Sequence, residues 1–216
     1  MKIIAFVFIY SFIIVCHSVN AQSSSGLDVK VNAERGTYVI TSKKMRWSFI
    51  GSIGHSLTNL AGKHGDDPLG KYKEVRFSWK TDIPYAASIR WYTKKSVIIF
   101  SVILPEGSAV LPAAFPSFTT LPRPMHAFSY ADDVFAPPQF KLNQTSTPWL
   151  FFNDKAEAYI ISPASDFMIS RLTGNEETRI NSSMNAEIKN LHPGFVHKTI
   201  LVLGQGIGKT WDLWGK

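Results

Sequence analysis

Two short segments of the sequence come close to catalytic patterns without completing them. Residues 204–210 end in the Gly-Lys-Thr of a phosphate-binding loop, but Leu203 stands where that loop needs its first glycine. Residues 54–58, Gly-His-Ser-Leu-Thr, approach the Gly-x-Ser-x-Gly elbow of lipases, but Thr58 fills a position that must lack a side chain. We therefore expect only a turn between a strand and a helix at 204–210, and we predict neither phosphoryl transfer nor serine hydrolysis.

Histidines and carboxylates are too scattered to predict a metal site or an acid–base pair. After residue 21 no two histidines have the i, i+4 spacing of a helical zinc site. Three pairs of acidic residues are adjacent in the sequence, at 66–67, 132–133 and 176–177, and neighbouring side chains face opposite ways in a strand. Of these pairs, Asp132 and Asp133 lie in an aromatic-rich segment, where they either form a turn or contact sugar hydroxyls. We predict no catalytic residue, no metal and no cofactor.

Aromatic side chains are the remaining candidates for a binding function. The apolar faces of aromatic rings can cover the C–H patches of sugars when the rings are exposed. Trp149, Tyr130 and Trp91 are the candidates for such a face. The alternative is that each ring belongs to the hydrophobic core, as most large aromatic side chains do.

The elements that must position these residues are predicted to be β-strands. Residues 27–31, 75–80 and 88–92 alternate apolar and polar types, the period of a half-buried strand. Residues 97–104 are apolar on both faces and predict a central strand covered on both sides, paired in a hairpin with 88–92. Further strands are expected at residues 37–41, 47–49, 149–152, 158–161, 184–191 and 199–203, and a helical turn at 56–61 and at 208–214. The pattern predicts an all-β, antiparallel β-sandwich with a short C-terminal helical turn, as one domain over residues 27–216.

Residues 105–148 differ in amino-acid composition from the rest of the chain. Prolines crowd this segment and alternate with phenylalanines and Tyr130. Prolines forbid a long helix and confine strands to edges, while the aromatic residues argue against disorder. We therefore expect an ordered but irregular excursion packed on the sandwich.

The N-terminus has the layout of a secretory signal peptide at residues 1–21. Lys2 precedes an uncharged apolar run from Ile3 to Val15, and Val19-Asn20-Ala21 fits a signal-peptidase site. The run is too short to cross a bilayer as a helix, so we expect no membrane association after cleavage and a secreted or, in bacteria, periplasmic location. Residues 22–26 are expected to form a flexible leader. The only cysteine, Cys16, lies in the signal, so the mature chain cannot form disulfides or thiolate sites.

Charge and sequons add limited constraints. The formal net charge is +7, but no cluster exceeds two adjacent basic residues, so no nucleic-acid partner is predicted. Asn143 and Asn181 begin Asn-x-Ser/Thr sequons and are possible glycosylation sites.

A set of motifs in the second half of the chain resembles a known family. The motifs are Phe115-Pro116-x-Phe118, Leu121-Pro122-Arg123, Phe135-Ala136-Pro137-Pro138-x-Phe140, Pro148-Trp149-Leu150-Phe151-Phe152, the segment 161–168, and Gly204-x-Gly206-Ile207 to Trp214-Gly215. In this order they resemble the N-terminal β-sandwich region of secreted glycoside-hydrolase-like proteins of the α-galactosidase and raffinose-synthase kind. The resemblance implies a β-sandwich that precedes a catalytic (β/α)8 barrel, whose carboxylates lie in the barrel.

Two functions from different classes follow as hypotheses. The first is a non-catalytic N-terminal domain of a carbohydrate-active enzyme, with the chain a fragment whose partner is a following barrel domain. Trp211 and Trp214 lie three residues apart, so on a helix they share a face that either packs back on the sandwich or docks on such a partner. The second is a free-standing secreted carbohydrate-binding or interaction module.

The signal peptide gives the first testable prediction. Expression with secretion should yield a chain that begins at Gln22, because peptidase cleavage after Ala21 removes the apolar segment. N-terminal sequencing or intact-mass measurement of the exported protein checks this. An exported chain that still begins at Met1 would contradict it.

Overall fold

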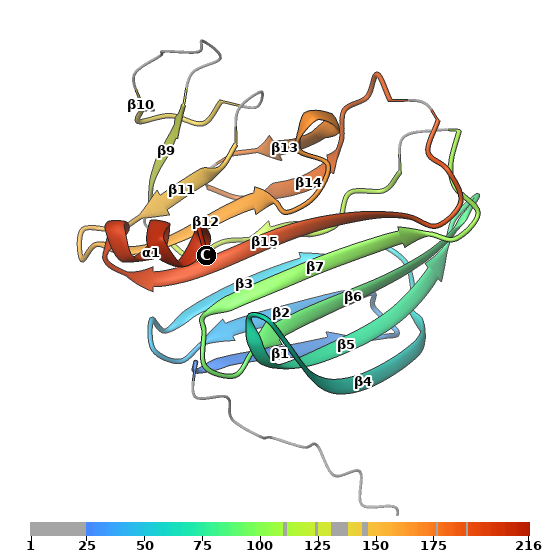
Figure 1. Cartoon of the computed structure of the whole chain (residues 1–216), viewed down its shortest axis with the longest axis horizontal. Coiled ribbons are helices and arrows are strands. Elements are labelled where there is room, and N and C mark those ends of the chain that lie inside the picture. The colour runs from blue at the N-terminus through green and yellow to red at the C-terminus, as the bar shows by residue number, and fades with distance from the viewer. Residues whose placement is uncertain are drawn as a thin grey trace, which may run out of the picture.

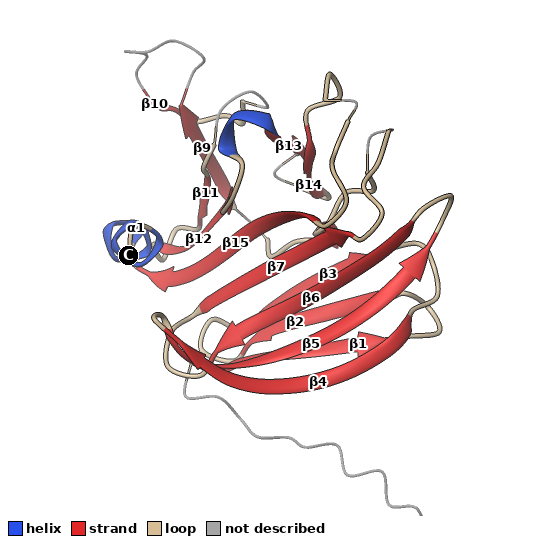
Figure 2. Cartoon of the chain, turned by 45° about the vertical axis from the view of Figure 1, so that its right-hand side comes forward, coloured by secondary structure: helices blue, strands red, loops and turns tan. Residues whose placement is uncertain are grey.

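The protein is built from two antiparallel β-sheets that face each other (Figures 1 and 2). The computed structural model describes residues 25–109, 112–123, 125–130, 138–143, 147–175, 177–188 and 190–216. The smaller sheet has the order β1 (Leu27–Asn32), β2 (Thr37–Ser42), β3 (Trp47–Ser52), β8 (Ser117–Thr120), β14 (Ile180–Met184) and β13 (Ser170–Gly174). The larger sheet has the order β10 (Pro138–Gln139), β9 (His126–Tyr130), β11 (Trp149–Phe152), β12 (Glu157–Pro163), β15 (Phe195–Gln205), β7 (Val97–Leu104), β6 (Pro84–Tyr92), β5 (Gly70–Lys80) and β4 (Thr58–Asp67). The all-β sandwich expected from the sequence is confirmed.

The alternating segments lie where their pattern predicts. Val75, Phe77 and Trp79 of β5 all face the core, and β6 pairs with β7 in the expected hairpin. β7 lies inside the large sheet, but only its inner face is fully covered, because Ile99 is half-buried and Ile103 is exposed on the other side. The expectation of cover on both faces is therefore wrong for this strand.

Two expected elements have a different structure. Residues 56–61, expected as a helical turn, instead lead into the edge strand β4. The polar, glycine-containing sequence of β4 lacks the alternation of apolar and polar residues by which a strand is recognised. The strand expected at 184–191 is wrong, because β14 ends at Met184. Asn185 then accepts a hydrogen bond from the Glu187 backbone N–H at 3.1 Å and its carbonyl accepts one from Ile188 at 3.0 Å, so the chain turns.

The described parts of the segment 105–148 are more regular than its prolines suggest. They contribute β8 to the small sheet, and β9 and β10 to the large one. Pro116 and Pro122 flank β8 rather than interrupt it, which agrees with the exclusion of proline from strand interiors. Phe115 and Phe118 are buried between the sheets rather than packed on the outside.

A cluster of aromatic rings around Tyr38 joins the two sheets. Tyr38 of β2 lies 6.2 Å from Phe100 of β7 and 5.9 Å from both Phe115 and Phe118, measured between ring centroids. Its hydroxyl accepts a hydrogen bond from the Ser117 N–H at 2.9 Å and donates one to the Ser117 carbonyl at 3.1 Å. This pairing satisfies the buried phenol, whose pKa burial raises far above its ordinary value.

The helix α1 (Ile207–Trp214) covers part of the outer face of the large sheet. It follows β15 directly and packs on β15 and β12 (Figure 2). Thr210 is fully buried against Gly204 and its hydroxyl donates to the Gly206 carbonyl at 2.8 Å. Residues 204–210 thus form the strand-to-helix connection that was expected, with the turn at Gly206 and Gly-Lys-Thr inside α1. Trp211 and Trp214 are half-buried and both pack against the sheet, as in the first of the two roles expected for them.

Gly51 of β3 gives a test of this packing. A Cβ at residue 51 would collide with the ring and hydroxyl of Tyr38, whereas a Cβ at Gly62 of β4 would meet nothing. We expect Gly51→Ala to lower the free energy of unfolding by about 2 kcal/mol, the cost of overpacking a filled core. Gly62→Ala should change it by less than about 0.5 kcal/mol. Chemical denaturation of both variants measures the difference, and equal stabilities would refute this account of the core.

Candidate functional site

The sequence-selected aromatic residues have different environments. Trp149 is fully buried and its indole N–H donates to the Asn143 carbonyl at 2.7 Å, and Trp91 also belongs to the core. Neither ring offers a face to a ligand in solution. Tyr130 is 43% exposed. Asp132 and Asp133 lie outside the described residues.

The two sequon asparagines lie in opposite halves of the fold. Asn181 is half-buried on β14, and its side-chain oxygen accepts a hydrogen bond from the Ser117 hydroxyl at 2.7 Å. Asn143 follows β10, and its backbone N–H donates to the Ser129 hydroxyl at 2.9 Å. Glycosylation at either residue stays a prediction.

Tyr130 belongs to an exposed group of aromatic rings at the β9–β11 end of the large sheet. Its ring lies edge-on to Phe128 at 5.8 Å between centroids. Phe140, which follows β10 and is 78% exposed, lies 5.8 Å from Phe128 and 6.4 Å from Phe152 of β11. Phe140 therefore stands between the rings of two strands and leaves most of its own surface open to solvent.

These rings border a groove with a polar rim. The groove has a volume of about 400 Å³ and is lined by Met125, His126, Ala127, Phe140 and Phe152. We call it the β9–β11 groove. The His126 ring lies 5.3 Å from the Phe152 ring, and its Nε2 lies 2.9 Å from Oδ1 of Asp154. A titratable pair thus stands directly beside apolar ring faces.

Strand register explains how the groove forms. β11 pairs with β9 so that Phe152 lies opposite His126 and Leu150 lies opposite Phe128. Side chains alternate between faces along a strand, so His126, Phe128 and Tyr130 share the outer face while Ala127 and Ser129 point inward. The alternation at residues 126–130 was a usable signal in the sequence, but the surrounding prolines obscured it. The contribution of Phe140 depends on a turn that no periodicity predicts.

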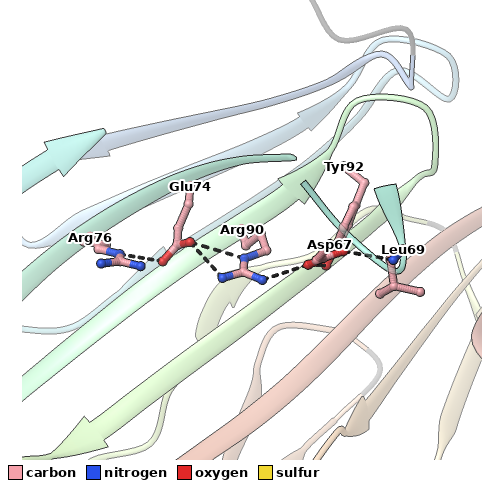
Figure 3. A network of polar contacts seen from close by, with 6 residues as sticks. All are labelled: Asp67, Leu69, Glu74, Arg76, Arg90 and Tyr92. Atoms are coloured by element: carbon pink, nitrogen blue, oxygen red, sulfur yellow. Dashed lines mark hydrogen bonds and ion pairs between the residues drawn. The ribbon is translucent and has the colours of Figure 1, made fainter. Parts of the chain in front are cut away.

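A second polar constellation lies on the outer face of β4, β5 and β6 (Figure 3). Glu74 of β5 is almost fully buried and accepts hydrogen bonds from Arg76 at 2.7 Å and from Arg90 at 2.9 Å. Arg90 also donates to Asp67 of β4 at 2.9 Å, and the Tyr92 hydroxyl donates to the same carboxylate oxygen at 2.7 Å.

These contacts make the network a structural clamp. Burial would raise the pKa of Glu74, but the hydrogen bonds from Arg76 and Arg90 outweigh it, so the pKa is lowered and the carboxylate stays charged. Burial, with the bond to Asp67, raises the pKa of Tyr92 to about 12. The charges neutralise one another across three strands and tie the edge strand β4 to the sheet. Because each carboxylate already accepts from neighbouring donors, the arrangement offers little to an incoming ligand.

His197 is a buried histidine between the sheets. Its Nε2 lies 3.1 Å from the Ser182 hydroxyl of β14, and Thr199 donates to that hydroxyl at 2.7 Å. Its Nδ1 lies 3.4 Å from the hydroxyl of Ser170, which itself donates to a backbone carbonyl at 2.7 Å. These partners favour one neutral tautomer, with the proton on Nδ1. Burial lowers the pKa of His197 to about 4, against a smaller opposing effect of Asp166.

The His197 group is placed for structure rather than for catalysis. Ser182 and Thr199 are fully buried, and the cavity beside the ring has a volume of only about 10 Å³. A void of that size holds one water at most. The serine–histidine contact therefore links β14 of the small sheet to β15 of the large sheet.

The Gly-His-Ser segment lines a separate surface cavity of about 510 Å³, next to Asn59, Lys80 and Pro84. Ser56 and His55 are exposed, and a strand rather than a helix follows them. The segment thus lacks the strand–turn–helix of a nucleophile elbow. Within the described ranges, no group of three or more histidine or acidic residues could hold a metal ion, and no helix is long and apolar enough to cross a membrane.

Comparison with known proteins relates the fold to glycoside hydrolases. The sequence matches no protein-family model and no curated protein. The structure aligns with a glycoside hydrolase family 97 enzyme from Pseudoalteromonas sp. strain K8 in complex with acarbose, with a TM-score of 0.55 and 13% identity, over 86% of this chain and 35% of that enzyme. A variant of that enzyme in complex with panose aligns with a TM-score of 0.55 and 12% identity over the same shares.

At this identity the likeness concerns the fold alone. The chain spans about a third of the length of these enzymes, since it covers 35% of each. The fold therefore matches a region of glycoside hydrolases, in agreement with the broader part of the resemblance in the sequence. The narrower relation to α-galactosidases and raffinose synthases stays a prediction.

The buried histidine predicts a specific loss of stability in acid. The unfolded state binds a proton below the ordinary pKa of 6.5, while the folded state stays neutral until about pH 4. Stability from this residue is therefore complete above pH 6.5 and falls as the pH drops toward 4, by about 2 to 3 kcal/mol. Denaturation curves between pH 7 and 4.5 should show this fall in the wild type and a shallower one in His197→Gln.

The exposed His64 provides the control for this prediction. His64→Gln removes an exposed histidine of the edge strand β4 and should leave the wild-type pH dependence unchanged. A His197→Gln variant that loses stability in acid as steeply as the wild type would contradict the assignment.

Proposed function

We propose that this chain is a non-catalytic β-sandwich domain of a secreted carbohydrate-active protein of the glycoside-hydrolase kind. The observation that carries the proposal is the alignment of 86% of the chain with about a third of a glycoside hydrolase family 97 enzyme. The state of the buried titratable groups agrees with it. His197 lies in the core and Glu74 is held by two arginines, so neither is placed to exchange protons with a substrate. In the proposed protein a separate catalytic barrel performs the hydrolysis.

A second candidate is a free-standing secreted carbohydrate-binding module. The β9–β11 groove favours it, since exposed rings beside a polar pair are the features that a sugar-binding face requires. The two candidates differ in whether the chain serves a catalytic partner or acts alone.

Hydrolysis assays and the downstream coding sequence test the proposal. The purified mature chain should release no product above buffer from aryl α- and β-glycosides or from oligosaccharides. The reading frame beyond codon 216 should continue into a barrel with acidic residues at its strand ends. A stop codon there with glycan binding and no hydrolysis would favour the second candidate. A stop codon there with measurable hydrolysis by a homogeneous monomer would overturn both.

A further inference from the structure

The β9–β11 groove has the composition of a ligand site. Phe140 keeps 78% of its surface exposed although it contacts two other rings, and Tyr130 keeps 43%. Singly exposed apolar residues are common on protein surfaces, but a group of neighbouring aromatic side chains around a hollow is not. Phe128 and Phe152 support the exposed rings from below, because they pack on the buried residues of β11 and β12.

The polar rim of the groove indicates which chemical groups a ligand must carry. The His126 side chain is 59% exposed and that of Asp154 is 87% exposed, so their 2.9 Å contact lies in reach of an incoming molecule. The second carboxylate oxygen of Asp154 can accept a hydrogen bond from a hydroxyl group, and the imidazole can donate or accept one. A ligand that matches both features carries an apolar face and hydroxyl groups at its edge.

The volume of the groove and the charge of its lining distinguish a small neutral ligand from a protein partner or a phosphorylated ligand. A volume of about 400 Å³ lies in the range of small-ligand sites. A stable protein interface needs roughly 800 Å² from each partner, contributed by some 20 to 30 residues. The five lining residues of the groove include no lysine or arginine, so a phosphorylated ligand would find no strong cation among them.

We propose that the β9–β11 groove binds a pyranose unit of a glycan. The C–H face of the sugar lies on Phe140 and Phe152, and its hydroxyl groups exchange hydrogen bonds with Asp154 and His126. This inference rests on the proposed function and adds to it a site and a ligand class. Tyr130, selected from the sequence, does not line this groove but contacts Phe128, whose ring contacts Phe140, whereas Trp149 and Trp91 lie in the core.

Binding measurements on the mature chain test the site. We expect a screen of neutral oligosaccharides built from glucose, galactose, mannose, xylose and N-acetylglucosamine to identify at least one ligand by glycan array and calorimetry. Phe140→Ala should weaken its binding by about tenfold or more, since the exposed ring supplies the apolar contact. Asp154→Asn should weaken it several-fold while leaving the fold intact, because the side chain is 87% exposed.

Phe167→Ala is the matched control. Phe167 is 56% exposed in the short 3-10 helix η1 (Phe167–Ile169), outside the groove, so its removal should leave the affinity unchanged. Thermal unfolding of each variant separates lost binding from lost structure. Equal affinity of the wild type, Phe140→Ala and Asp154→Asn would overturn the site.

Failure of the site and failure of the proposed function can be told apart. If the wild type binds no glycan in the screen, the groove inference is wrong, but a non-catalytic domain that serves a barrel still stands. If Phe140→Ala instead disrupts association with a catalytic barrel, the groove is a protein contact and the inference is likewise wrong. Hydrolysis by the chain itself would overturn the proposed function without bearing on the groove.

Discussion

The aromatic cluster around Tyr38 is the contact on which the two-sheet arrangement depends. The centroid of the Tyr38 ring lies within 6.2 Å of the ring centroids of Phe100, Phe115 and Phe118. Tyr38 and Phe118 belong to the small sheet and Phe100 to the large sheet. The Tyr38 hydroxyl must be hydrogen-bonded because it is buried, and the two backbone groups of Ser117 satisfy it. Because Ser117 belongs to β8, these hydrogen bonds hold β8 beside β3. Without β8 the small sheet would divide between β3 and β14.

In the part of the chain that the structure describes, the larger sheet has nine strands, and its outer face is not covered by the smaller sheet. The protein handles this surface in three ways. The helix α1 covers the middle, and the Glu74–Arg90–Asp67 network fills the β4–β6 side with charges that neutralise one another. At the β9–β11 end, among the described residues, neither a helix nor a network of paired charges covers the sheet, and aromatic rings are exposed to solvent. The groove is therefore distinct from the rest of this face in both chemistry and exposure.

Local periodicity predicted most of the fold and little of the candidate site. Strands with one buried face, such as β5 and β6, alternate apolar and polar residues, so the sequence predicted both. β4 was missed because an edge strand exposed on both sides has no reason to alternate. Tyr130 was selected for its residue type, but its ring contacts Phe128, and Phe140 and Phe152 join the group only through contacts between strands that the sequence does not show. Trp149 is fully buried, which agrees with the core alternative considered for it, because a large ring in an apolar strand is more often core than surface.

Burial places several titratable groups with strongly perturbed pKa values between the sheets, out of reach of a substrate. Acid–base catalysis needs a group with a perturbed pKa that a substrate can reach. Here burial perturbs His197 and Tyr38, and both lie between the sheets. The His126–Asp154 pair at the groove is accessible, because its side chains are 59% and 87% exposed. In the site that we propose there, the open rings and the hydrogen-bonding groups beside them would select a ligand by its shape and by the position of its hydroxyl groups.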